Sequence, residues 1–394
     1  INNLDWPLLI GFLTLISFGL MTIYSVAFNE ESPSVFSFSE KYGKQIMWIF
    51  LSLFLGVVVF LIDSDVYKKF ALPIYLVTIG LLVLVLFMPP INGARAWIGV
   101  GSMGIQPAEF AKITTALLLA KYVSDINLKL LSSYNILIAL VIIVIPMGLI
   151  LLQPDAGTFV VFTAFFFVLY REGLTFDPFI LKFINLLPKV NYKNTWIGSH
   201  FIPILFVLVF LSILTILLGH KNLGIIPGLP LYGSFGIIVS LFLVSVLGIL
   251  FIQKFGTKRE KVKIRLIIIL SFIVGSASSY FVEYSFVHLA DHQKDRIELF
   301  LGLKEDPNGK DYNRNRAMAA VGSGGFSGKG YKNASVSSVK TNHVPESETD
   351  FIFCPFAEEW GFLGGAVLLM IYLFIIIRIL VIAERQRSTF NRIY

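Results

Sequence analysis

Ten apolar runs of a length suited to crossing a lipid bilayer constrain the fold of this chain more than any other feature. An α-helix rises 1.5 Å per residue, so about 20 apolar residues cover the roughly 30 Å of hydrocarbon in a membrane. Hydrophobic residues make up 56% of the chain and charged residues 14%, unlike the composition of a soluble domain. The sequence therefore predicts an all-α polytopic membrane protein with about ten transmembrane helices. The runs lie at approximately 6–28, 46–62, 70–88, 107–123, 136–152, 157–170, 201–218, 232–252, 266–287 and 351–377.

The distribution of basic residues predicts which loops face the cytoplasm, because short cytoplasmic loops carry an excess of Lys and Arg. With the N-terminus inside, 18 of the 32 Lys and Arg residues fall in inside segments, five in short outside segments and nine in the long loop after the ninth run. We therefore expect a multi-pass membrane protein with its N-terminus in the cytoplasm and three regions. These are nine transmembrane helices over 1–287, a large extracytoplasmic loop over 288–350, and a tenth helix with a basic cytoplasmic tail over 351–394.

Several function classes are excluded by the composition. The single cysteine, Cys354, excludes an internal disulfide framework and a cysteine-based metal site. No HExxH string occurs among the five histidines, so a zinc-helix motif is absent. The net charge of +7 follows from the membrane topology, and we expect no nucleic-acid partner. The chain begins at Ile1 without a signal-peptide pattern, so we expect a trimmed or fragmentary sequence.

The first polar cluster lies in "GARAWIGVGSMGIQPAEFAK", residues 93–112, at the outer end of the third and fourth runs. A charge at the bilayer centre costs about 2.5–3.5 kcal/mol on insertion scales, so charged residues in such runs are candidates for function. Glu109 and Lys112 are three residues apart on one helix and can neutralise each other. Arg95 suits the interface, where a guanidinium can hold a phosphate with two hydrogen bonds. A structural ion pair and an interfacial anchor are the competing interpretation.

Two more polar clusters fall at the same predicted side of the membrane. In "LLQPDAGT", residues 151–158, Asp155 can cap the next helix, which is the structural alternative to substrate binding. In "PESETDFIFCPFAEEWGFLGG", residues 345–365, Glu358 and Glu359 are adjacent and point about 100° apart on a helix, so at most one faces a given cavity squarely. The clusters therefore predict a polar outward-facing cavity, suited to a substrate with a lipid tail and a polar head.

The long loop supplies a candidate catalytic residue and a glycine-rich string. Asp306 lies in "LGLKEDPNGKDY", residues 301–312, and is a candidate general base, a turn residue before proline being the alternative. The glycines of "VGSGGFSGKG" favour tight backbone geometry or close approach to a ligand. By itself this string is a weak phosphate-loop signal, because it lacks the Walker spacing.

Five strings together resemble the SEDS family (shape, elongation, division and sporulation), the RodA/FtsW peptidoglycan polymerases. They are "GARAWIGVG…IQPAEFAK", "LLQPDAGT", "DHQKDRIELFLGLKEDPNGKDY", "AVGSGGFSGKG" and "VPESETDFIFCPFAEEWGFLG", and they occur in the family's order. The "HQKDRI" and "GSGG" strings favour the RodA branch. The resemblance implies a glycosyltransferase in the bacterial cytoplasmic (inner) membrane that joins lipid II units into glycan strands on the outer face of that membrane during cell elongation. It also implies a complex with a monofunctional class B penicillin-binding protein, a transpeptidase, and with other membrane proteins of the elongation machinery.

The resemblance also assigns roles to residues. The family's essential aspartate matches Asp306, and its important arginine and lysine match Arg95 and Lys112. The acceptor hydroxyl has a pKa far above 7, so a carboxylate must take its proton as attack develops. Cationic side chains or a divalent ion such as Mg²⁺ or Mn²⁺ can stabilise the departing pyrophosphate; the sequence requires no cofactor. We expect Asp306 to be catalytic and the substrate-binding residues to be Arg95, Glu109, Lys112, Asp155, Lys329, Glu346, Asp350 and Glu359.

The chain departs from the family pattern at several positions. Asp311 replaces the second glycine of the family's "DPxGxGY" string, and Arg316 and Ala317 stand where relatives have Gln-Ser. "NASVSSVKTNH" replaces a stretch that relatives fill with a "GTQ"-like string. The family's last two helices are not in the sequence, and the seventh and eighth runs with the 171–200 loop look like an insertion. These departures concern acceptor recognition more than the fold.

Three other functions stay open at the sequence level. A flippase or transporter could move the same lipid-linked sugar, although the paired broken helices frequent in transporters are not apparent. A different outer-face glycan polymerase or ligase could use an isoprenoid-linked donor. A non-catalytic scaffold could position a transpeptidase.

Overall fold

The chain forms two compact units, which are described separately. Unit 1 comprises Ile1–Leu174 with Asp311–Tyr394, and unit 2 comprises Thr175–Lys310. The structure is a computed structural model and describes residues 4–28, 36, 38, 40–89, 95–100, 103–126, 132–153, 155–174, 177–178, 200–219, 232–255, 258–288, 294, 297–298, 301, 303, 312–338, 344–345 and 347–394.

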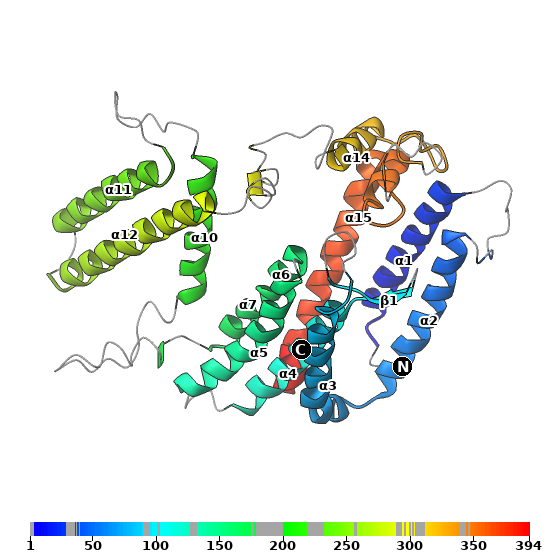
Figure 1. Ribbon diagram of the computed structural model, residues 1–394, viewed down its shortest axis with the longest axis horizontal. Coiled ribbons are helices and arrows are strands. Elements are labelled where there is room, and N and C mark those ends of the chain that lie inside the picture. The colour runs from blue at the N-terminus through cyan, green and yellow to red at the C-terminus, as the bar shows by residue number, and fades with distance from the viewer. Residues whose placement is uncertain are drawn as a thin grey trace. The chain divides into compact units, whose positions relative to one another are not determined.

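Unit 1 is a helical bundle with one short β-hairpin (Figure 1). Helix α4 packs against α3, α5 and α16, and α1 packs against α2 and α15, while α14 packs against α15. The hairpin strands pair antiparallel with Ile98 opposite Ile105 and lead directly into α4. The elements are α1 (Trp6–Ala27), α2 (Lys41–Leu61), α3 (Ser64–Val85), β1 (Ile98–Val100), β2 (Met103–Ile105), α4 (Pro107–Asp125), α5 (Ser133–Leu152), α6 (Ala156–Phe162), α7 (Ala164–Arg171), α14 (Tyr312–Ser323), α15 (Phe353–Glu384) and α16 (Thr389–Ile393).

The described residues of unit 2 form three apolar helices, α10 (Phe201–Leu217), α11 (Gly233–Phe255) and α12 (Lys258–Val287). Helix α12 packs against both of the others. The Glu283 carboxylate of α12 accepts a hydrogen bond from the Ser234 backbone N–H at 2.9 Å, at the start of α11. This contact gives a backbone donor at the start of α11 a partner, because the first turn of a helix has no acceptor within the helix.

The predicted apolar runs coincide with helices. Each of the ten runs overlaps at least one helix, so the prediction of an all-α polytopic membrane protein is confirmed. Among the described residues, seven helices are long and apolar enough to cross a membrane: α1, α2, α3, α5, α11, α12 and α15. The α6–α7 region and α10 are shorter apolar helices. The sixth run is not a single helix, because α6 ends at Phe162 and α7 begins at Ala164.

Polar contacts join the ends of helices that are distant in sequence. The Asp5 carboxylate caps α1 by accepting from Leu8 N at 3.1 Å, and it pairs with Arg378 of α15. The Arg378 guanidinium holds the pKa of Asp5 below its usual range. At α16, Arg392 pairs with the buried Glu172 at 2.5 Å. These ion pairs connect α15 and α16 to the N-terminal part of unit 1.

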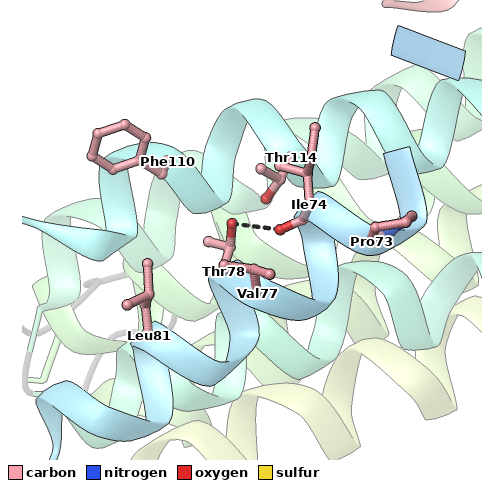
Figure 2. Close-up of a pocket in the computed structure, with 7 residues that line it drawn as sticks. All are labelled: Pro73, Ile74, Val77, Thr78, Leu81, Phe110 and Thr114. Carbon is pink, nitrogen blue, oxygen red and sulfur yellow. Dashed lines mark hydrogen bonds between the residues drawn. The ribbon is translucent and has the colours of Figure 1, made fainter. Parts of the chain in front are cut away.

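An apolar groove of about 320 Å³ lies between α3 and α4, and residues of both helices line it (Figure 2). Its two hydroxyl groups donate to carbonyls of their own helices, Thr78 to Ile74 at 2.9 Å and Thr114 to Ala111 at 3.4 Å. The groove therefore presents hydrocarbon rather than polar groups, and it does not suit a sugar. Its lining residues are Pro73, Ile74, Val77, Thr78, Leu81, Phe110 and Thr114.

Candidate functional site

The predicted ion pair at the start of α4 is present. Lys112 Nζ lies 2.8 Å from both carboxylate oxygens of Glu109. The hairpin and Pro107, which is pre-organised for a first helical turn, set where α4 begins and so place this pair one turn inside it. Both side chains keep substantial exposure, so the pair is accessible from outside unit 1. Substrate binding by this pair stays a prediction.

Arg95 is exposed and lies just before the hairpin. Its Nη1 donates to the Leu86 carbonyl oxygen at 3.1 Å, which ties the segment after α3 to the end of that helix. A guanidinium has five N–H donors, so one bond to a carbonyl does not use up its capacity to hold a phosphate. The structure is therefore compatible with the predicted role of Arg95, which stays a prediction.

Asp155 is the N-cap of α6. Its Oδ1 accepts from Thr158 N at 3.0 Å, and its Oδ2 accepts from Thr158 Oγ1 at 2.8 Å and from Gln106 Nε2 at 3.0 Å. Because Gln106 precedes α4, the carboxylate joins the starts of two helices. The structural alternative raised by the sequence, N-capping, is thus what the geometry shows. A carboxylate with three protein donors has less capacity for substrate hydroxyls.

The glycine-rich segment that follows α14 exchanges backbone hydrogen bonds with α15, at a point where the helical hydrogen bonding of α15 is interrupted. Gly361 of α15 has φ +66° and ψ −166°, outside the helical region. In an unbroken helix Phe362 N and Leu363 N would donate to the carbonyls of residues 358 and 359. Here they donate to Gly325 O at 2.9 Å and Phe326 O at 3.2 Å instead. The string therefore supplies acceptors that the kinked helix lacks.

The exchange of backbone partners is reciprocal. The freed carbonyl of Glu358 accepts from Lys329 N at 3.0 Å, and the carbonyl of Glu359 accepts from Gly330 N at 2.9 Å. Buried backbone groups need partners, and these four bonds satisfy both segments. The sequence predicted that the glycines allow close approach to a ligand or a tight backbone; what they approach closely is the backbone of α15.

The side chain of Glu358 is fully buried, with 0% of its surface exposed. Its Oε1 accepts from Lys329 Nζ at 2.5 Å and from the backbone N–H groups of Ser335 and Val336, each at 2.9 Å. Its Oε2 accepts from Ser337 N at 2.8 Å and Ser337 Oγ at 2.5 Å. Lys329, predicted to bind substrate, therefore also neutralises this buried acid. The sequence noted Glu358 but did not include it among the site residues.

The Glu359 side chain has hydrogen-bond partners that differ from those of Glu358. It is 1% exposed, and its Oε1 accepts from Lys332 N at 3.1 Å and from the Ser25 hydroxyl of α1. The Lys332 ammonium lies 4.1 Å from the ring centre of Phe28 and 4.6 Å from that of Tyr24, which favours a cation–π contact. The side chains of Glu358 and Glu359 thus point in different directions, as helix geometry requires, and both accept hydrogen bonds from the segment 329–337. Contact between Glu359 and a substrate would need the loop to move.

The remaining predicted residues fall in the segment before α15. Asp350 is exposed, whereas Asp306 and Glu346 lie outside the described residues. Nearby, the mostly buried Glu348, which the sequence did not single out, forms an ion pair with Lys41 at the start of α2. The only sequence signal was its place in "PESETD", because its partner lies about 300 residues earlier.

Within the described part of the chain, no group of three or more His, Cys, Asp or Glu side chains is arranged to hold a metal ion. The charges at the candidate site come instead as acid–base pairs, Glu109 with Lys112 and Glu358 with Lys329. The Lys112 and Lys329 side chains are exposed to a similar extent, 30% and 28%.

Comparison with known proteins gives a consistent result over nearly the whole chain. The chain is 29% identical to a peptidoglycan glycosyltransferase RodA of Treponema pallidum, over 100% of this chain and 85% of the relative. It is 27% identical to a peptidoglycan glycosyltransferase MrdB of Escherichia coli, over 99% of this chain and 79% of the relative. A probable peptidoglycan glycosyltransferase FtsW of Trichlorobacter lovleyi is 25% identical over 98% of this chain and 78% of the relative.

A solved structure supports the fold. It is described as "Structural coordination of polymerization and crosslinking by a peptidoglycan synthase complex", and it aligns with a TM-score of 0.58 at 20% identity over 99% of this chain and 81% of the solved chain. The family model described as the FtsW/RodA/SpoVE cell cycle protein matches residues 6–192 and 198–394. The chain therefore belongs to the FtsW/RodA/SpoVE family of cell cycle proteins.

Proposed function

We propose that this chain is a peptidoglycan glycosyltransferase that polymerises lipid II into glycan strands on the outer face of the cytoplasmic membrane during cell elongation. The observation that carries the proposal is its similarity, over 98–100% of its length, to proteins named as peptidoglycan glycosyltransferases. The polar residues at the start of α4, where Glu109 and Lys112 are accessible, support it. They suit a substrate with a polar head and a lipid tail.

In this proposal Asp306 is the general base, and Arg95 and Lys112 stabilise the departing pyrophosphate. The acceptor hydroxyl loses its proton as it attacks the donor sugar, and a carboxylate is a suitable proton acceptor. Negative charge develops on the leaving group, so fixed cations lower the barrier. Two lipid-tethered substrates held in one groove also gain proximity.

A labelled-lipid experiment tests the function. Purified protein with its transpeptidase partner is incubated with labelled lipid II in vesicles, and glycan polymer and lipid scrambling are measured separately. Polymer supports the proposal. Scrambling without polymer would make the chain a flippase, and neither activity, with the transpeptidase still bound, would make it a scaffold.

The arrangement in the membrane is part of the proposal. We infer about ten transmembrane helices with the N-terminus in the cytoplasm, and an extracytoplasmic loop over 288–350 between the helices of 1–287 and those of 351–394. The basic run between 254 and 265 supports this orientation, because such runs stay on the cytoplasmic side.

Cysteine labelling tests the orientation. Asn308→Cys in a Cys354→Ser background should react with a membrane-impermeant maleimide in intact cells. The Cys354→Ser background alone contains no cysteine, so any label that it takes up is unrelated to residue 308. Reaction only after the cells are permeabilised would reverse the proposed orientation.

We also propose a class B penicillin-binding protein as the main partner, with other membrane proteins of the elongation machinery. The solved structure of similar fold is described as a complex that coordinates polymerization with crosslinking. Crosslinking of glycan strands is the reaction of a transpeptidase, so a polymerase of this kind gains from a bound transpeptidase.

Replacing Lys112 by Ala should lower the rate of polymerisation about tenfold or more. The change removes a cation from the proposed leaving-group site and leaves Glu109 without its ion pair. Lys121→Ala, at the other end of the same helix, is the matched control and should keep the wild-type rate. Wild-type polymerisation by Lys112→Ala at normal protein levels would assign the Glu109–Lys112 pair to structure alone.

A further inference from the structure

We propose that Glu358 is a positioning residue, which holds the segment 324–337 against α15 and so fixes the layer on which α14 packs. This inference rests on the proposed function for its effect on rate. Glu358 is buried, and in this proposal it acts through the hydrogen bonds that it accepts.

The geometry is that of a carboxylate around which a loop folds. Six hydrogen bonds converge on its two oxygens, from the Lys329 ammonium, three backbone N–H groups and two serine hydroxyls. The backbone donors belong to three consecutive residues, Ser335, Val336 and Ser337, which lie outside any helix or strand. Their N–H groups would need other buried partners if the carboxylate were absent.

The same network reaches the element that follows Asp306 in the chain. Helix α14 begins six residues after Asp306, at Tyr312. It packs on α15 through a small core of Ala317, Ala320 and Cys354, against which Val336 of the loop also packs. Loss of the carboxylate therefore loosens a layer that fixes both the loop and α14.

Charge makes the network sensitive to a small change. The Glu358 carboxylate and the Lys329 ammonium are 2.5 Å apart in a mostly buried setting, where an unpaired charge is costly. Glu358→Gln keeps the shape but turns an amide NH₂ group towards donors. Because backbone N–H groups cannot donate to an amide nitrogen, part of the loop loses its acceptor.

Hydrogen exchange and steady-state kinetics of the full-length protein with its transpeptidase partner test the proposal. In Glu358→Gln, amide exchange over 331–338 should accelerate at least tenfold. The kcat for lipid II polymerisation should fall about tenfold, with KM within about twofold of wild type. Glu384→Gln is the matched control, because it makes the same substitution in an exposed pair of the same helix; it should change neither quantity.

Two further variants keep the test decisive. If Glu358→Gln does not fold, Ser337→Ala takes its place in the test. Ser337→Ala removes one hydroxyl donor to the carboxylate but keeps the backbone hydrogen bond of residue 337, so it should change amide exchange and kcat in the same directions by about threefold. Lys329→Gln combined with Glu358→Gln removes the stranded cation and should recover part of the slow amide exchange over 331–338 that Glu358→Gln loses.

The outcomes separate this inference from the proposed function. Unchanged exchange in Glu358→Gln and Ser337→Ala overturns the role of the carboxylate in docking the loop, whatever the activity. Faster exchange with a wild-type kcat overturns positioning, and a raised KM with an unchanged kcat points to substrate contact instead. A wild-type protein that makes no polymer overturns the proposed function and, with it, the effect on rate, while exchange still decides the docking.

Discussion

Replacing Asp306 by Asn should lower the rate of glycan polymerisation by about 10²–10⁴-fold, the usual loss when a general base is removed. Asparagine keeps the size and polarity of the side chain but cannot accept the proton of the attacking hydroxyl. Pro307 follows and biases Asp306 towards an extended or turn backbone, so its carboxylate can project from the loop. Binding of lipid II should change far less than the rate.

Glu305 is the matched control for this experiment. It carries the same charge at the neighbouring position and points the opposite way if the stretch is extended. Glu305→Gln should therefore keep most of the activity, measured as polymer from purified lipid II in the presence of the transpeptidase partner. Near wild-type polymerisation by Asp306→Asn, or an inactive Glu305→Gln, would assign the base to another residue.

Replacing Gly328 by Ala should destabilise unit 1 by about 2–5 kcal/mol, the sum of backbone strain and overpacking. Gly328 has φ +81°, and a Cβ there would collide with the Glu359 carbonyl oxygen and lie 2.7 Å from Gly361 N. The backbone of α15 cannot withdraw without losing the exchanged hydrogen bonds. We expect a much lower temperature of unfolding in detergent and little polymer.

Two neighbouring glycines separate the effect of backbone strain from the effect of overpacking. Gly325 also has a positive φ, +58°, but a Cβ there meets nothing within 4 Å, so Gly325→Ala should cost only the strain, about 1–2 kcal/mol. Gly322 lies in α14 and also has open space, so Gly322→Ala should be neutral or slightly stabilising. Equal unfolding temperatures for Gly328→Ala and Gly325→Ala would show that the backbone contact with α15 is not tight.

Features that depend on nearby residues were predictable from the sequence. Apolar length located the helices, because each run must satisfy its own backbone hydrogen bonds in lipid. The Glu109–Lys112 pair and the Asp155 cap use partners three residues away, a spacing that sequence reveals directly. Helix α4 is not among the seven helices that are long and apolar enough to cross a membrane, and its middle, including Leu119 and Ala120, is buried against other helices.

Features built from distant segments were not predictable in the same way. The donors to the Glu358 carboxylate come from 21 to 29 positions away, without any periodic pattern. Gly361 was visible as a glycine in an apolar run, but nothing local shows that the loop supplies acceptors across the kink. The divergence of Glu358 and Glu359 followed from helix geometry, whereas the partners of each came only from the folded loop.

The interruption of α15 at Gly361 has a consequence for the order in which this protein is assembled. Phe362–Glu384 comprises 23 residues. At 1.5 Å per residue this part is about 34 Å long, enough to cross the bilayer alone. The acidic turns before it find their hydrogen-bond donors in the segment 324–337, which precedes them in the chain. Insertion of Phe362–Glu384 can thus finish before Glu358 and Glu359 are buried, and the segment 324–337 then supplies their hydrogen-bond donors.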